Sequence, residues 1–166
     1  MKPPKKTHKT SGKEPGGMPR RVNLIIFLGL VVVIVLSSGV SASARPDAGS
    51  ANAAIATGEK QLGKPYQKFT DGPKTFSCTG LMRYILREAG VDNDAPWVAT
   101  DFLDRYERIS PRNMKPGDIV VFPGDYAGMY VGDGMLLNAN SVAGKVTYTD
   151  MSYLAEPLGV ARPPYN

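Results

Sequence analysis

Residues 76–90, which read FSCTGLMRYILREAG, decide the fold of this chain. The apolar side chains in this stretch recur at helical spacing: Leu81, Ile85 and Ala89, joined by Met82 and Leu86. Ser77 is a suitable N-cap, and Gly90 is a suitable stop after the last turn. The stretch therefore predicts a helix that begins at Cys78 and is buried along one face.

Cys78 is the one cysteine of the 166-residue chain, so the chain cannot form an internal disulfide. At the start of a helix, unpaired N–H groups and the positive end of the dipole stabilise a thiolate. We therefore expect its pKa to fall below about 8.5. A first-turn cysteine backed by an apolar helix suits a nucleophile. Two other interpretations stay open, a small buried hydrophobe and a thiol that pairs with another molecule.

After this helix the pattern changes from helical to extended. Short apolar or alternating stretches predict strands at 119–122, 126–131, 135–140 and 145–149. A helix is also expected over residues 53–62, and another within 92–110 that has Trp97 on its apolar side. Helices followed by strands indicate an α+β fold, with helices packed on a small antiparallel sheet or partial barrel.

The basic charge is confined to the start of the chain. Of the net +5, residues 1–21 hold seven Lys and Arg against one Glu, whereas residues 45–166 hold 13 against 14 acidic residues. The part expected to fold is therefore not basic, which argues against nucleic acid as a partner.

Residues 1–44 have the arrangement that is typical of an export signal. An apolar run at 24–36 follows the basic segment, and small residues then lead to a peptidase site after Ala44. The alternative is an uncleaved anchor over residues 24–40, at the lower limit of the roughly 17–25 residues that span a bilayer. We predict a leader (1–44), a linker (45–52) and a domain (53–166) that is secreted or held in the cell envelope. Membrane contact is expected only through residues 24–40, if the leader stays.

Five short strings occur in order along the chain: LGKPY at 62–66, FSCTGL at 76–81, MKPGDIVVF at 114–122, AGMYVGDG at 127–134 and LGVAR at 158–162. Together they resemble the NlpC family of papain-like cell-wall cysteine peptidases, over roughly residues 53–163. The resemblance implies the papain-like NlpC fold and a stem peptide of bacterial peptidoglycan as substrate. It also implies Cys78 as nucleophile, a histidine base on the first hairpin strand and a third polar residue on the second.

The chain differs from the family pattern at the position of the histidine base. Its position is occupied by Tyr126, the third position is Asn138, and the only histidine of the chain is His8, in the leader. A tyrosine with a pKa of about 10 stays protonated at pH 7, so it is a poor general base, although it can donate a hydrogen bond. We therefore expect little or no peptide-bond hydrolysis. Tyr126 as a plain strand aromatic and Asn138 as a partner of backbone groups remain open.

Four further residues are predicted to contact the substrate: Tyr66, Ser77, Thr79 and Asn140. In the resembling family an Asp usually occupies the position of Ser77 and helps to receive the free amine of the stem peptide, which weakens the expectation of the usual ligand. Asn140 is equally suited to satisfy the backbone of a turn. No group of ligating residues has metal-site spacing and no glycine-rich phosphate loop occurs, so neither metal nor cofactor is predicted.

The expected hairpin around Gly132-Asp133-Gly134 decides whether the site can form. A three-residue loop would pair Gly128 with Asn138 and place Tyr126 and Asn138 on one face of the sheet. A two-residue loop would place them on opposite faces.

Three functions are compatible with these observations. The first is an exported NlpC-like domain that binds stem peptides or an envelope protein without cutting them, because the histidine is missing. The second is an active cysteine peptidase or amidase that uses Cys78 with a substitute base. The third is a structural subunit of an envelope or secretion assembly.

Overall fold

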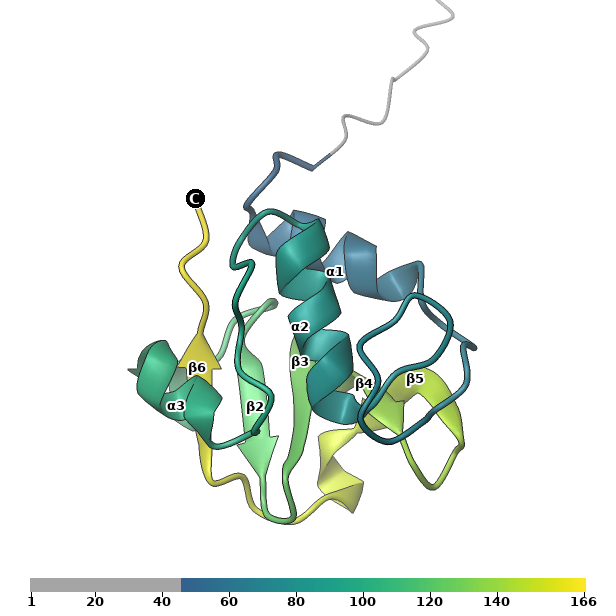
Figure 1. The fold of residues 1–166 in the computed structure, drawn as a ribbon. Helices are drawn as coiled ribbons and strands as arrows, with labels where there is room; N and C mark the ends of the chain where they lie inside the picture. The colour runs from purple at the N-terminus through teal and green to yellow at the C-terminus, as the bar shows by residue number, and fades with distance from the viewer. Residues whose placement is uncertain (1–45) are drawn as a thin grey trace, which may run out of the picture. The chain divides into compact units, whose positions relative to one another are not determined.

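A computed structural model describes residues 46–166 (Figure 1). In chain order the elements are α1 (Ala51–Glu59), α2 (Cys78–Glu88), α3 (Asp101–Arg105), β1 (Glu107–Ile109), the 3-10 turn η1 (Pro111–Asn113), β2 (Ile119–Phe122), β3 (Tyr126–Gly132), β4 (Met135–Asn140), β5 (Lys145–Asp150), the 3-10 turn η2 (Met151–Tyr153) and β6 (Gly159–Arg162). The predicted leader lies outside the described residues. Of the helices described, none is long and apolar enough to span a bilayer.

The strands form one antiparallel sheet in the order β1-β6-β2-β3-β4-β5. The four strands expected from the sequence are confirmed to within one residue at their ends. In Figure 1, α2 lies across one face of this sheet over β3 and β4, and α1 packs beside it. The α+β class with helices on a small antiparallel sheet is therefore confirmed.

The helix α2 forms for the reasons expected from its sequence. The Ser77 side chain accepts a hydrogen bond from the backbone N–H of Gly80 at 3.0 Å, which caps the first turn. The helix buries a continuous apolar face made of Leu81, Met82, Ile85 and Leu86, each with no exposed surface. At its far end Gly90 adopts a φ of 75°, the left-handed conformation that ends many helices. The start of α2 at Cys78 is thereby fixed by both a cap and a core.

Alternating residues of the strands serve two separate apolar layers. One face, toward α2, carries Ile119, Val121, Ala127, Met129 and Leu137. The opposite face carries Val120, Phe122, Leu136 and Val160, with Tyr126 packed against them. This period of two is what a sheet buried on both faces requires. Tyr126 therefore points to the face away from the body of α2.

The two other helix predictions were partly wrong. α1 begins two residues earlier than expected, because Ser50 caps it by accepting from the N–H of Ala53 at 3.1 Å. It also ends earlier, and Leu62 is 40% exposed. The helix expected within 92–110 is reduced to the five residues of α3.

The loop before α3 has a clear physical cause. The carboxylate of Asp92 accepts hydrogen bonds from the Asp94 N–H, from the Arg105 guanidinium and from the Tyr106 hydroxyl. These bonds hold the segment in a non-helical path. Trp97, expected on a buried helix face, is instead 46% exposed.

The hairpin between β3 and β4 combines both turn predictions. Its turn has two residues, Asp133 and Gly134, both with positive φ, which is the shorter of the two loops considered. A β-bulge between Tyr130 and Gly132 compensates for the difference, and Met129 pairs with Leu137. Beyond the bulge, the two strands pair in the register that was expected for a three-residue loop.

Candidate active site

A cavity of about 640 Å³ opens at the N-terminal end of α2. Its lining includes five of the seven residues predicted from the sequence: Cys78, Tyr126, Tyr66, Ser77 and Thr79. Asn138 and Asn140 are not among the lining residues. Residues from the loop after α1, from α2 and from the start of β3 thus meet at one place.

The thiol of Cys78 is held by backbone groups from the start of β3. Its Sγ donates a hydrogen bond to the carbonyl oxygen of Asp125 at 3.3 Å. Burial raises the pKa of the thiol above its ordinary value, and this outweighs the backbone N–H groups of Ala127 and Thr79, which lower it. The predicted fall in this pKa was therefore wrong, because burial of the sulfur exceeds the effect of the helix terminus. A carbonyl oxygen accepts the hydrogen bond but cannot take the proton.

Tyr126 begins β3 and packs its ring on that of Phe122, with the ring centroids 5.7 Å apart. Its hydroxyl is buried and has no hydrogen-bond partner among the residues that the structure describes. Burial raises the pKa of Tyr126 to about 12. Nearby Thr149 lowers this pKa in part, and Cys78 adds a smaller increase. The phenol therefore stays protonated at any physiological pH and can only donate or accept a hydrogen bond.

Asn138 and Asn140 belong to a polar chain on β4 and β5. The Thr149 hydroxyl donates to Asn138 Oδ1 at 3.3 Å and accepts from Asn140 Nδ2 at 3.1 Å. Asn138 is fully buried, and its Nδ2 lacks a partner within the described part of the chain. By the register of β3 and β4, Asn138 lies opposite Gly128 and shares the face of Tyr126. The predicted pair is therefore on one face, although only Tyr126 reaches the cavity.

Asn140 has a second set of contacts that explains its position. Its Oδ1 accepts hydrogen bonds from the N–H groups of Val142 and Ala143, both at 2.9 Å, and so closes the turn between β4 and β5. This is the turn role that the sequence left open for it. Its predicted contact with a substrate stays a prediction.

Ser77 is only 7% exposed, and its hydroxyl is fully used within the fold. Besides capping Gly80, its Oγ donates to the Thr70 carbonyl oxygen at 3.1 Å. Gly80 is required here, because a Cβ at this position would collide with the same Thr70 carbonyl. Ser77 thus anchors the loop before α2, and its predicted contact with a substrate stays a prediction.

Further cavity residues were not identified as site residues from the sequence: Lys68, Phe69, Trp97, Val98 and Asp125. Asp125 has a φ of 59° at the end of the tight connection from β2 to β3, and its Oδ1 accepts from the Ala99 N–H at 2.6 Å. The Pro123-Gly124-Asp125 turn before Tyr126 was a signal that could have placed Asp125 at the site. No local pattern marks the other residues.

The alkylation rate of Cys78 should follow a pH profile displaced to higher pH than that of the unfolded chain, because burial disfavours the thiolate. The measurement is the rate of reaction with iodoacetamide from pH 6 to 10, read by mass spectrometry on the single cysteine. The same protein in concentrated urea supplies the reference, with a midpoint near pH 8.5. A fast plateau below pH 7 in the folded protein would show a stabilised thiolate and contradict this prediction.

Known proteins resemble this chain in both sequence and fold. The sequence profile of the family described as the NlpC/P60 family matches residues 63–159. The probable endopeptidase p60 of Listeria monocytogenes is 39% identical over 95 residues, which cover 51% of this chain and 18% of that protein. The chain thus corresponds to less than a fifth of the length of this relative.

Solved structures share the fold. The P60 domain of an antigen from M. avium subspecies paratuberculosis is 28% identical, with a TM-score of 0.59 over 68% of this chain and 93% of that one. RipD from Mycobacterium tuberculosis is 19% identical, with a TM-score of 0.58 over 68% and 95% of the two chains. RipD is described as a non-catalytic NlpC/p60 domain protein adapted to peptidoglycan binding.

Proposed function

The chain belongs to the NlpC/P60 family, and from this premise we propose that its domain binds the stem peptides of bacterial peptidoglycan without hydrolysing them. The class of ligand is supported by two relatives together, since p60, 39% identical, is a probable endopeptidase and RipD is adapted to peptidoglycan binding. The fold does not impose catalysis, because RipD, which shares it, is a non-catalytic domain.

The observation that carries the proposal is the surroundings of the Cys78 sulfur. Attack on a peptide carbonyl requires a thiolate, and the proton must then reach the leaving amine. The thiol donates its hydrogen bond to the Asp125 carbonyl oxygen. This oxygen can neither remove the thiol proton nor deliver a proton to the leaving amine. Tyr126, which the resemblance places at the position of the histidine base, has a pKa raised to about 12. The site therefore offers the thiol no hydrogen-bond acceptor that could serve as its base.

The same side chains are suited to binding. The Tyr126 hydroxyl has no partner among the described residues, and it can donate a hydrogen bond to a carbonyl oxygen of a ligand once the side chain turns toward the cavity that it lines. Such a bond would satisfy a group that is otherwise buried without a partner, which favours the bound state. The export of the domain to the cell envelope follows from the predicted leader and completes the proposal.

One observation favours an active enzyme as the second candidate. Cys78 lines the cavity from the first residue of α2, where backbone N–H groups of Ala127 and Thr79 approach its sulfur. A water molecule would then have to serve as the base. This candidate predicts slow hydrolysis that depends on Cys78.

Incubation of the protein with purified muropeptides distinguishes the two candidates. We expect saturable binding by titration calorimetry, with no new amine termini by mass spectrometry after prolonged incubation. A Cys78→Ala variant should bind with an affinity within about twofold of the parent, since a neutral thiol contributes little to recognition. New termini that appear with the parent and vanish with Cys78→Ala would overturn the proposal in favour of the enzyme. Absence of binding by both proteins would overturn it altogether.

A further inference from the structure

Phe69 is an exposed aromatic residue in a backbone conformation that aromatic residues avoid. Its side chain is 88% exposed, and its φ is 60°. This left-handed conformation favours Gly, Asn or Asp, and a bulky residue there is strained. The ring gains almost nothing from burial in the fold that would offset this strain. It does line the cavity beside Cys78, which indicates a role in binding.

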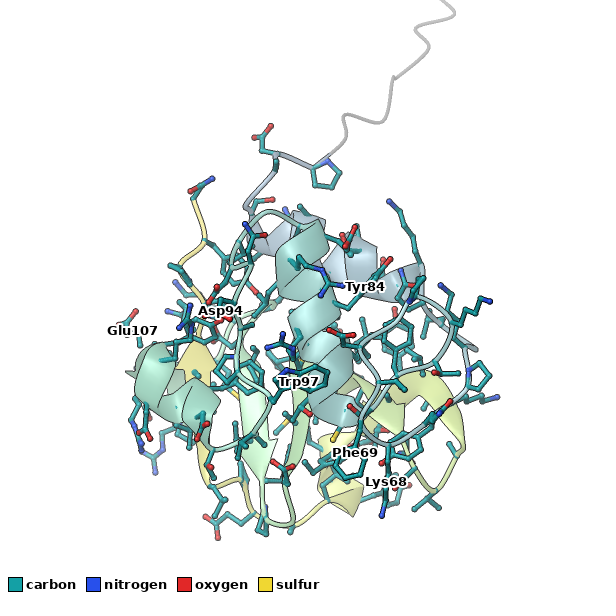
Figure 2. The ribbon with its side chains drawn as sticks, in the orientation of Figure 1. Lys68, Phe69, Tyr84, Asp94, Trp97 and Glu107 are labelled. Carbon is teal, nitrogen blue, oxygen red and sulfur yellow. The ribbon has the colours of Figure 1, made fainter. Side chains whose placement is uncertain are left out.

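Trp97 completes an apolar rim with Phe69 and Val98, and all three side chains are at least 46% exposed. The guanidinium carbon of Arg83 lies 4.2 Å from the centre of the Trp97 ring and supports it from the helix side. Arg83 is itself held by a hydrogen bond to the Ala95 carbonyl oxygen. Figure 2 shows Phe69 and Lys68 near the N-terminal end of α2, and Trp97 beside the same helix. The rim is thus formed by side chains that the structure positions without burying them.

One cationic side chain at the cavity has no partner among the described residues and is available to an anionic ligand. Its lining contains two charged side chains, Lys68 and Asp125. The Asp125 carboxylate already accepts the N–H of Ala99 at 2.6 Å. Lys68 is exposed and forms neither an ion pair nor a hydrogen bond with the residues that the structure describes. The N-terminus of the 11-residue helix α2 opens into the same space and adds positive potential.

We infer that this cavity binds peptides in which a free carboxylate lies next to an apolar side chain, with Lys68 selecting the carboxylate and Phe69 contributing affinity through the apolar side chain. The ammonium of Lys68 pairs with the carboxylate. The rings of Phe69 and Trp97 cover the apolar side chain. The inference rests on the proposed binding of stem peptides and adds which chemical form of the peptide is preferred.

Two synthetic stem peptides that differ only in a free or amidated glutamate carboxyl group test the role of Lys68. By titration calorimetry we expect the free acid to bind at least fivefold more tightly to the full protein. In the Lys68→Gln variant this preference should disappear, with the affinity for the amidated peptide unchanged. Lys74→Gln is the matched control, because Lys74 is exposed in the same loop and does not line the cavity.

The role of Phe69 is tested by Phe69→Gly, because glycine accepts the φ of 60° without strain. We expect an unchanged or higher melting temperature together with an affinity about tenfold lower for both peptides. Tyr153→Ala, which removes an 85% exposed ring outside the cavity, should leave the affinity unchanged. A lower melting temperature with unchanged affinity would show that the ring of Phe69 supports the loop, and would overturn its role in binding.

The outcomes separate this inference from the function on which it rests. If the parent protein binds both peptides equally and Lys68→Gln changes neither affinity, selection of the carboxylate is overturned while the binding of stem peptides stands. If the parent binds neither peptide, both are overturned.

Discussion

Replacement of Tyr126 by His is expected to convert the binding domain into a hydrolase of stem peptides. A histidine with a pKa near 6.5 can accept the Cys78 proton and return it to the leaving amine, which the phenol with a pKa of about 12 cannot. The buried Tyr126 hydroxyl has no partner among the described residues, so its removal leaves no group unsatisfied. General acid and base catalysis typically contributes about 10²–10⁴ in rate. A gain of this size over the parent is the expected result, measured as new amine termini by mass spectrometry.

Two matched variants control this experiment. Tyr126→Phe removes the hydroxyl with the ring retained on Phe122, and should fold as stably as the parent without cleaving. The double variant Tyr126→His with Cys78→Ala should lose the new activity entirely. If Tyr126→His folds and binds muropeptides but cuts none, the missing base is not what limits hydrolysis, and the explanation offered for the inactive thiol is wrong.

Asp118→Ala should produce the largest loss of stability among the polar substitutions considered. The Asp118 side chain is 1% exposed, and its carboxylate accepts two hydrogen bonds from Arg162 and one from the Lys115 N–H, all at 2.8 Å. Removal of one partner leaves the Arg162 guanidinium, 26% exposed, without its counter-charge between β2 and β6. Because the remaining guanidinium reaches water, we expect the loss of these charge-assisted hydrogen bonds to cost about 1.5–3 kcal/mol in the free energy of unfolding.

The measurement is equilibrium unfolding in urea. Asp104→Ala provides the matched control, because Asp104 forms an ion pair with Arg108 at 2.7 Å in which both side chains are at least 62% exposed. That pair should contribute less than about 1 kcal/mol. Equal losses for the two variants would show that burial does not set the strength of the Asp118 contact.

The elements of this fold were largely predictable because their causes are local. The cap at Ser77, the apolar face of α2 and the alternation of the strands each depend on residues within a few positions of one another. The loop from Asp92 was missed because its carboxylate is held by Arg105 and Tyr106, more than ten positions away. Local pattern alone favoured a helix there.

The residues of the site were predictable in part for the same reason. The place of Cys78 at a helix start and that of Tyr126 at a strand start followed from local patterns, and both line the cavity. Lys68 and Phe69 belong to a loop without periodicity, and only the folded chain brings them beside the thiol. Trp97 was expected in the core, because an aromatic residue at helical spacing is usually buried.

By itself the sequence determined the α+β class, the helix that begins at Cys78, the positions of four strands and the absence of a histidine from residues 46–166. Only the tertiary structure decided the chemical state of the thiol. Its hydrogen-bond acceptor, Asp125, lies 47 positions along the chain, and burial raises the thiol pKa against the helix terminus that was expected to lower it. The reason is physical: caps and periodicity act between neighbours in sequence, whereas desolvation depends on every group that the fold brings around an atom.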